Sequence, residues 1–264
     1  MDPLPISVCI ISGPEVRRIE KLLASIAGWT TEIVVLLNED VHDGTEEIAK
    51  KFGARILRHP WQGFRDQKNL VLTHARQPWI LSLDADEEVS PALHDSIRQF
   101  FRDDSRQFSG ACFPRKVWFL GRWITHGDWY PDYVLRLFKR ECGRWAGTEE
   151  HCKVEVQGDT KKITGDLHHY TNPTISGYVL KMNYYADLHL QRQLEEGAPW
   201  SAFAAAFRSG WRFVRAYIFR LGFLDGFPGF FIAASTAYST LVRHSRLFEH
   251  QQAKVPPCDP PKSH

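Results

Sequence analysis

Short apolar runs alternate with amphipathic segments over the first hundred residues, and this alternation leaves few folds open to the chain. The apolar runs have the length of strands and lie at 6–11, 32–37, 54–58 and 79–88. Segments with helical periodicity follow the first three, at 16–28, 44–53 and 66–77. Strands that alternate with helices predict an α/β fold with an open, mainly parallel sheet covered by helices on both faces. Ligands of such sheets bind beyond the carboxyl ends of the strands.

The rest of the chain has a different character. Residues 108–170 are rich in aromatic side chains and contain short β-like stretches, so we expect them to form a second wall of the site within a domain of residues 1–173. From 174 to 250 the pattern is helical. Residues 251–264 are rich in proline, which predicts a disordered tail.

The composition excludes several classes of protein. The 264 residues carry 33 basic and 31 acidic side chains, a net charge of +2, which argues against a dedicated nucleic-acid-binding protein. Five cysteines are scattered without a C-x-x-C pair, as expected for reduced thiols inside a cell. The first apolar run is about five residues long and follows an acid and two prolines, so it is too short and too acidic for a secretory signal. We therefore expect a cytoplasmic protein.

Four acids stand close together in "LSLDADEEVS", at the end of the fourth apolar run. In an extended strand Asp84 and Asp86 point the same way, so both carboxylates would face one spot beyond the sheet edge. Two carboxylates at one spot favour a hard divalent cation such as Mg²⁺ or Mn²⁺, with phosphate oxygens of a substrate completing its coordination.

The same acids also fit the start of a helix. Acidic side chains are favoured near the positive end of a helix. Ser90 followed by Pro91 is a good N-cap with proline at the first helical position. Glu87 and Glu88 are therefore expected to be surface acids that lead into this helix. Because Asp84 directly follows the apolar "WILSL", it carries the stronger functional argument.

An ordered series of motifs along nearly the whole chain resembles the family 2 glycosyltransferases, close to the bacterial lipopolysaccharide-core glucosyltransferase branch. In chain order the motifs are "DGTEEIAKKFGA", "W-x-GF", "QKN", "DADEE", "GDWYPDYVLRLF", "HHY" and "GFLDG". The resemblance implies a GT-A fold with a C-terminal helical extension, and makes 108–170 the acceptor side. It also implies inverting transfer of a sugar, glucose, from a UDP-sugar to a lipid-linked saccharide such as lipopolysaccharide core. Mn²⁺ or Mg²⁺ would be held through the D-x-D.

The resemblance also assigns roles to single residues. Asp84 would lie near the donor's ribose, and Asp86 would bind the metal that bridges the diphosphate. His169 of "HHY" is a further candidate metal ligand. Lys68 of "QKN" would meet a phosphate, unless it is a solvated lysine on a helix face. Arg136 of "RLF" would pair with the diphosphate or with a nearby acid.

The nucleotide-binding loops depart from the family pattern. Relatives have Asn-Glu after the first strand, where this chain has Pro14 and Glu15. Their second strand ends in an aspartate that contacts uracil, whereas this chain reads "LLNEDVHDGT". Asn38, Glu39 or Asp40 would take that part, and an asparagine amide offers both a donor and an acceptor to a base edge.

The position of the catalytic base departs more sharply. Relatives have His-Glu before the "K-V-E-V-x-G" strand, and here His151 is followed by Cys152. A neutral thiol is a poor substitute for a carboxylate base. We expect Glu150 to be the base, with Glu149 and Asp132 as alternatives. The same departure leaves open a catalytically inactive nucleotide-sugar-binding protein. A metal-dependent phosphohydrolase ranks lower, because the histidines lack the usual ligand spacing.

The C-terminal third contains a basic, amphipathic segment. In "FRSGWRFVRAYIFRL" one helical face is apolar and arginines line the adjoining face. Residues 205–250 hold six arginines and two acids. The uncharged stretch 227–242 is shorter than the roughly 20 residues that span a bilayer. This pattern predicts peripheral attachment to the inner face of the cytoplasmic membrane. The alternative is a helical pair packed against the catalytic domain, with solvated arginines.

Overall fold

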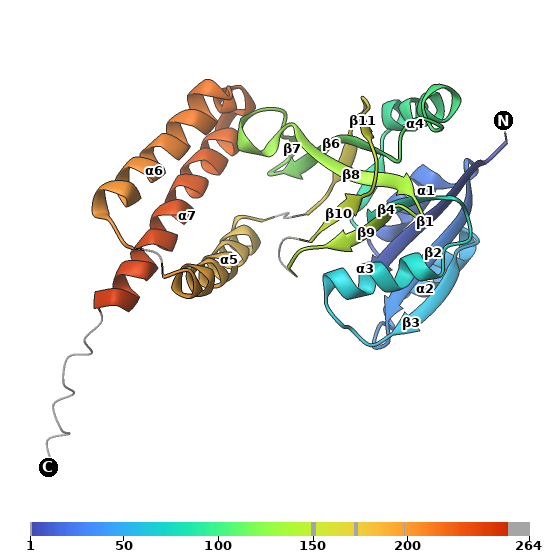
Figure 1. Ribbon diagram of the computed structural model, residues 1–264, viewed down its shortest axis with the longest axis horizontal. Coiled ribbons are helices and arrows are strands. Elements are labelled where there is room, and N and C mark those ends of the chain that lie inside the picture. The colour runs from blue at the N-terminus through green and yellow to red at the C-terminus, as the bar shows by residue number, and fades with distance from the viewer. Residues whose placement is uncertain (1, 149–151, 172–173, 198, 253–264) are drawn as a thin grey trace, which may run out of the picture. The chain divides into compact units, whose positions relative to one another are not determined.

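The computed structural model describes residues 2–148, 152–171, 174–197 and 199–252 (Figure 1). The chain divides into two compact units. The first unit consists of Met1–Trp123 and Trp129–Thr171, and the second of Ile124–Asp128 and Asn172–His264. A short segment from the middle of the sequence therefore belongs with the C-terminal helices.

A mixed sheet forms the first unit, with the order β3-β2-β1-β4-β8-β6-β12-β5 in the part of the chain described. Its parallel half consists of β1 (Leu4–Ser12), β2 (Thr30–Asn38), β3 (Arg55–His59) and β4 (Trp79–Asp84). The other half consists of β5 (Glu87–Val89), β6 (Gly110–Phe119), β8 (Asp132–Lys139) and β12 (Leu167–His169), with β7 (Arg122–Trp123) and β11 (Thr160–Lys162) paired to β6. A separate hairpin pairs β9 (Gly143–Ala146) with β10 (Lys153–Val156).

Helices cover both faces of the sheet, as the alternating pattern predicts. They are α1 (Ile19–Ile26), α2 (Thr45–Lys51), α3 (Phe64–Thr73) and α4 (Pro91–Asp103). One core joins α1, α2 and α4 to one face of the sheet, and a second core joins α3 and the β9–β10 hairpin to the other. Along β1, Val8 and Ile10 enter the first core while Cys9 and Ile11 enter the second. The predicted fold class is confirmed.

The acidic segment does not continue as one strand. β4 ends at Asp84, Ala85 and Asp86 form a turn, and β5 starts at Glu87. The prediction that Asp84 and Asp86 share a direction by strand alternation was therefore wrong, because the chain reverses to pair β5 antiparallel with β12. The predicted N-cap is confirmed, since the Ser90 hydroxyl accepts a hydrogen bond from the Leu93 amide at 3.2 Å.

The second unit is helical. It contains α5 (Ile175–Glu195), α6 (Ala202–Val214) and α7 (Gly226–Gln252), and a short 3₁₀ turn, η1 (Gly127–Trp129), spans the boundary. A π-helical turn, η3 (Arg215–Phe219), and a 3₁₀ turn, η4 (Gly222–Asp225), connect α6 to α7, which lie side by side (Figure 1). Residues 251 and 252 of the predicted tail are still helical, and 253–264 lie outside the described residues.

Among the described helices, none alone is long and apolar enough to cross a bilayer. One bent pair, Ala202–Phe219 with Gly222–Gln251, satisfies the length and composition criteria jointly, with 72° between its halves.

Candidate functional site

The carboxyl ends of β1, β2 and β4 meet at one edge of the sheet. Ser12 is in register with Leu37, and Ile11 with Asp84, so Asn38 at the end of β2 and Asp84 at the end of β4 lie on either side of the end of β1. Asn38 has a buried side-chain oxygen without a hydrogen-bond partner among the described residues. Glu39 is exposed. This edge is where the parallel sheet predicts a ligand, and the Asn38 oxygen is an acceptor that a ligand could satisfy.

Asp84 lies between two cations. Its Oδ1 is 2.6 Å from Lys68 Nζ and its Oδ2 is 2.8 Å from an Arg136 nitrogen. Both cationic side chains are almost fully buried, so Lys68 is not a solvated lysine on a helix face. Burial opposes ionisation of Asp84, but the charges and hydrogen bonds of Lys68 and Arg136 outweigh it and hold its pKa well below the usual range. Asp84 is therefore an anion whose side chain stays 26% exposed.

The ring of Trp145 lies against both cations. Lys68 Nζ is 4.1 Å and the Arg136 guanidinium carbon 5.0 Å from the centre of the Trp145 ring, within cation–π range. Asn69 fixes this tryptophan, because its amide accepts from Trp145 N and donates to Trp145 O, both at 2.9 Å. In the "QKN" motif, Asn69 thus joins α3 to β9 and Lys68 contacts Asp84.

Glu87 completes this buried charge cluster. It is 1% exposed, and its carboxylate accepts from Arg136 at 3.0 Å and from the Asp84 amide at 2.9 Å. The expectation of a surface acid at Glu87 was therefore wrong, because the buried Arg136 needs a second anion. Arg136 pairs with nearby acids, one of the two roles predicted for it. Its other terminal nitrogen is buried without a hydrogen-bond partner among the described residues.

Asp86 lies in the turn beside Asp84. Its Oδ2 is 3.4 Å from His169 Nε2 and 3.8 Å from Arg18, and its backbone oxygen accepts from Tyr170 N at 2.9 Å. Burial and the nearby Asp84 raise the pKa of Asp86, but His169 and Arg18 together outweigh them and the pKa lies below its usual value. The structure thus brings together Asp86 and His169, the two predicted metal ligands.

Arg18 is a member of the site that the motifs did not reveal. Glu15 holds it with two hydrogen bonds of 2.6 and 2.7 Å, and Arg18 donates to the Tyr170 backbone oxygen at 3.1 Å. Glu15 therefore contacts Arg18 in this structure, and the pair lies next to Asp86. The i,i+3 spacing of an acid and an arginine ahead of the first helix was the available signal.

The donor atoms around Asp86 suit a hard divalent cation. A carboxylate and an imidazole are ligands that Mn²⁺ accepts, and Mg²⁺ is commonly held by one or two carboxylates with substrate phosphates. Within the described residues no cluster of three or more metal-ligating side chains occurs. Substrate phosphates and water commonly complete the coordination of such a cation. Asp86 and His169 fit such a shared site.

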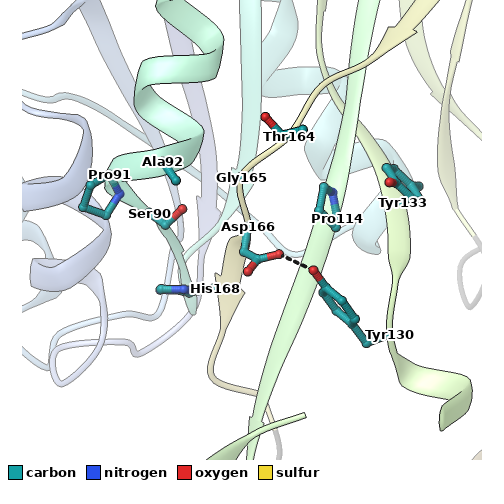
Figure 2. A pocket seen from close by; sticks show the side chains of 10 residues that line it. All are labelled: Ser90, Pro91, Ala92, Pro114, Tyr130, Tyr133, Thr164, Gly165, Asp166 and His168. Atoms are coloured by element: carbon teal, nitrogen blue, oxygen red, sulfur yellow. Dashed lines mark hydrogen bonds between the residues drawn. The ribbon is translucent and has the colours of Figure 1, made fainter. Parts of the chain in front are cut away.

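A cavity of 560 Å³ lies among the N-terminus of α4, β6, β8 and the segment before β12 (Figure 2). Asp166 lines it and accepts from the Tyr130 hydroxyl at 2.8 Å and from Lys116 Nζ at 3.1 Å. His168 also lines it and stacks on Trp123 at 4.2 Å. Successive histidines of β12 therefore have different partners, since His169 meets Asp86. Nothing in the motifs pointed to Asp166.

Comparison with known proteins identifies the family. The family model described as "Glycosyl transferase family 2" matches residues 7–157. The chain belongs to glycosyl transferase family 2. The predicted membership is confirmed, as is the GT-A type of fold, and the family makes the chain a glycosyltransferase.

Relatives extend over most of the chain. It is 26% identical over 262 residues to the "Lipopolysaccharide core biosynthesis glycosyltransferase LpsC" of Rhizobium meliloti, with 96% of both chains covered. It is 28% identical over 255 residues to "Uncharacterized glycosyltransferase RT0209" of Rickettsia typhi, covering 92% of this chain and 87% of that one. A solved structure of S. aureus TarS 1–349 in complex with UDP-GlcNAc has a TM-score of 0.49 and 11% identity, covering 94% and 92% of the two chains.

The residues at and around the expected position of the catalytic base have different surroundings. Glu149 and Glu150 lie outside the described residues. Asp132 Oδ2 accepts from Arg115 at 2.7 and 3.0 Å, so this carboxylate already has a cationic partner. Cys152 is partly buried and packs against the second core with Val154 and Trp145.

Proposed function

We propose that this family 2 glycosyltransferase moves a sugar, glucose, with inversion from a UDP-sugar to a lipid-linked saccharide such as lipopolysaccharide core, at the inner face of the cytoplasmic membrane. The observation that carries the proposal is the pair Asp86 and His169, 3.4 Å apart, next to the ionised Asp84 at the carboxyl edge of the parallel strands. The Rhizobium meliloti relative, named as a lipopolysaccharide core biosynthesis glycosyltransferase, supports the acceptor class.

We assign the donor's parts to separate residues. Asn38 offers to the base its side-chain oxygen, which has no hydrogen-bond partner within the described ranges. Asp84, kept anionic by Lys68 and Arg136, accepts hydrogen bonds from ribose hydroxyls through its exposed part. Lys68 and Arg136 place positive charge at this edge, and one Arg136 terminal nitrogen is buried without a partner in the part of the chain that the structure describes. Both charges favour the binding of an anionic donor.

Asp86 and His169 would hold Mn²⁺ or Mg²⁺ together with the diphosphate. The bound metal would stabilise the negative charge that develops on the leaving nucleoside diphosphate. Arg18, fixed by Glu15 and 3.8 Å from Asp86, adds positive charge on the same side.

The acceptor would occupy the cavity lined by Tyr130, Asp166 and His168. Its wall combines aromatic rings with a carboxylate and hydroxyls, groups that stack on sugar rings and bind sugar hydroxyls. We assign proton removal from the acceptor hydroxyl to Glu150, with Glu149 as its substitute, because Asp132 is held by Arg115.

Asp86→Asn tests the proposal. Transfer from UDP-glucose to a lipopolysaccharide-core acceptor should require Mn²⁺ or Mg²⁺, and the variant should need at least about tenfold more metal for half-maximal rate. The matched control is Asp95→Asn, a carboxylate that is 81% exposed on α4 and should behave as wild type. Transfer that proceeds equally well without metal and in Asp86→Asn would refute the assignment.

The departure at Cys152 favours one other function, that of a catalytically inactive nucleotide-sugar-binding protein. Calorimetry and transfer assays separate the two. UDP-sugar binding without turnover on any acceptor, unchanged in Glu150→Gln, would support the inactive binder instead.

A further inference from the structure

Large apolar side chains are exposed along α6 and around the turn into α7. They are between 39% and 78% exposed and comprise Phe203, Phe207, Trp211, Val214, Ile218, Phe219, Leu221, Phe223, Leu224, Phe227 and Phe230. We call this set the hairpin surface. On α6 the spacing of three, four and seven residues places these side chains on one face. A concentration of this size is typical of a surface that meets a partner.

The accessible charge of this region is entirely basic. Residues 202–231 contain four arginines and one acid, and that acid, Asp225, is fully buried. The second carboxylate of the region, Asp128, is 5% exposed and lies 3.1, 2.8 and 3.3 Å from Arg212, Arg215 and Arg220. These arginines nevertheless keep a third or more of their side-chain surface in solvent. Apolar side chains bordered only by arginines suit an anionic lipid surface better than a neutral protein face.

The geometry of the turn favours shallow entry. We call α6, α7 and the turn between them the helical hairpin. The pair is bent by 72° at its break, and neither helix is by itself long and apolar enough to cross a bilayer. Leu221 occupies the left-handed region with φ of 57° at this turn, and its side chain is 45% exposed. Glycine or asparagine would adopt this backbone at lower cost.

We propose that the turn from Val214 to Phe230 inserts into one leaflet of a bilayer that contains anionic lipid, while α6 lies in the headgroup layer with its arginines on lipid phosphates. Both ends of the hairpin then stay on the same side of the membrane. The inference deepens the proposed function by naming the device that holds the enzyme where a lipid-linked acceptor lies. The inference rests on the proposed function only in assuming that the acceptor is lipid-linked. Membrane binding itself requires no sugar transfer.

Vesicle flotation of the full chain tests the inference. The protein should float with vesicles of phosphatidylcholine and phosphatidylglycerol, float less with phosphatidylcholine alone, and be released partly by salt. Leu221→Asn should leave the thermal unfolding temperature unchanged or higher and weaken vesicle binding about tenfold, because one buried leucine is lost from the bilayer. Phe219→Gln should weaken binding at least as much.

Leu180→Asn is the matched control. Leu180 is a leucine on α5 that is 72% exposed and lies outside the hairpin surface, so its substitution should not change vesicle binding. Absence of binding to anionic vesicles, or equal losses in Leu180→Asn and Leu221→Asn, would overturn the inference. So would a dimer that the same two hairpin substitutions abolish while vesicles are ignored, since a second copy would then cover the surface.

Separate measurements test the proposed function and the membrane inference, so one can fail while the other holds. UDP-glucose binding measured in solution by thermal shift reports on the donor site alone. Vesicle binding reports on the hairpin surface alone.

Discussion

Arg136 bridges Asp84 and Glu87 with one terminal nitrogen, 2.8 Å from the first carboxylate and 3.0 Å from the second. The arginine and Glu87 are almost fully buried, whereas Asp84 remains partly open to solvent. Asp84, the carboxylate at the ligand edge, is therefore held in place by a buried arginine. The same guanidinium serves both the stability of the first unit and the charge of the site.

Arg136→Met should destabilise the protein by about 3–5 kcal/mol, because Glu87 and Asp84 would lose their shared buried cation. Urea unfolding followed by tryptophan fluorescence measures this free energy. Arg102→Met, which removes an exposed arginine from α4, is the control and should change it by less than about 0.5 kcal/mol. Equal, small effects of both substitutions would contradict the buried bridge.

Asp84 should make stability depend on pH in a defined direction. Its pKa is held low in the folded protein by Lys68 and Arg136, despite the opposing effect of burial. A carboxyl group with a lowered folded pKa contributes stability above its unfolded pKa of about 4, and this contribution is lost as the pH falls further. Unfolding free energies measured from pH 6 to pH 3 should therefore fall more steeply in wild type than in Asp84→Asn. Parallel curves would show that the pKa is not lowered.

Cys152 should prove to be a packing residue. Cys152→Ala should keep sugar transfer within about threefold of wild type and lose about 1 kcal/mol of stability, since only a partly buried sulfur is removed. Cys152→Glu, which restores the residue type of the relatives, should destabilise the protein more, because it places a carboxylate against the second core. Loss of transfer in the alanine variant at unchanged stability would instead make the thiol part of the chemistry.

The sequence predicted most of the fold because periodicity alone separates strands from helices in the first hundred residues. Val8 and Cys9 belong to different cores simply because successive strand residues face opposite ways. The turn at Ala85 and Asp86 was beyond this reasoning, since the reversal is set by pairing of β5 with β12, which is about 80 residues away in sequence.

The candidate site was predictable where a residue type matched a motif, as at Asp84, Asp86 and His169. The contacts that tune these residues were not. The sequence predicts a surface acid at Glu87, because it does not show that Arg136 lies beside this carboxylate in the folded protein. The spacing of Glu15 and Arg18 indicates their pairing, but not the tertiary contact that joins Arg18 to Tyr170. The contact of Asp166 with Tyr130 is likewise tertiary and has no local signal.

Asp225 of "GFLDG" anchors the segment Ile124–Asp128 within the second unit. One of its oxygens accepts from the amides of Thr125 and His126 at 2.9 and 2.7 Å, and the other accepts from the Thr125 hydroxyl at 2.9 Å. Although burial opposes it, these hydrogen bonds lower the pKa of Asp225. Asp225→Ala leaves both amides without this acceptor, at a cost of about 1–3 kcal/mol for each buried group that finds no water.

Hydrogen exchange of the Thr125 and His126 amides measures this effect locally. Both should lose protection, relative to intrinsic exchange at the same pH, in Asp225→Ala. In wild type the same loss should appear only once the pH falls below the lowered folded pKa of Asp225, where the carboxyl is protonated. Amides of β1 and β2 are the internal control, because they belong to the first unit and should exchange at unchanged rates. If protection of Thr125 survived the substitution, the anchor would lie elsewhere in the second unit.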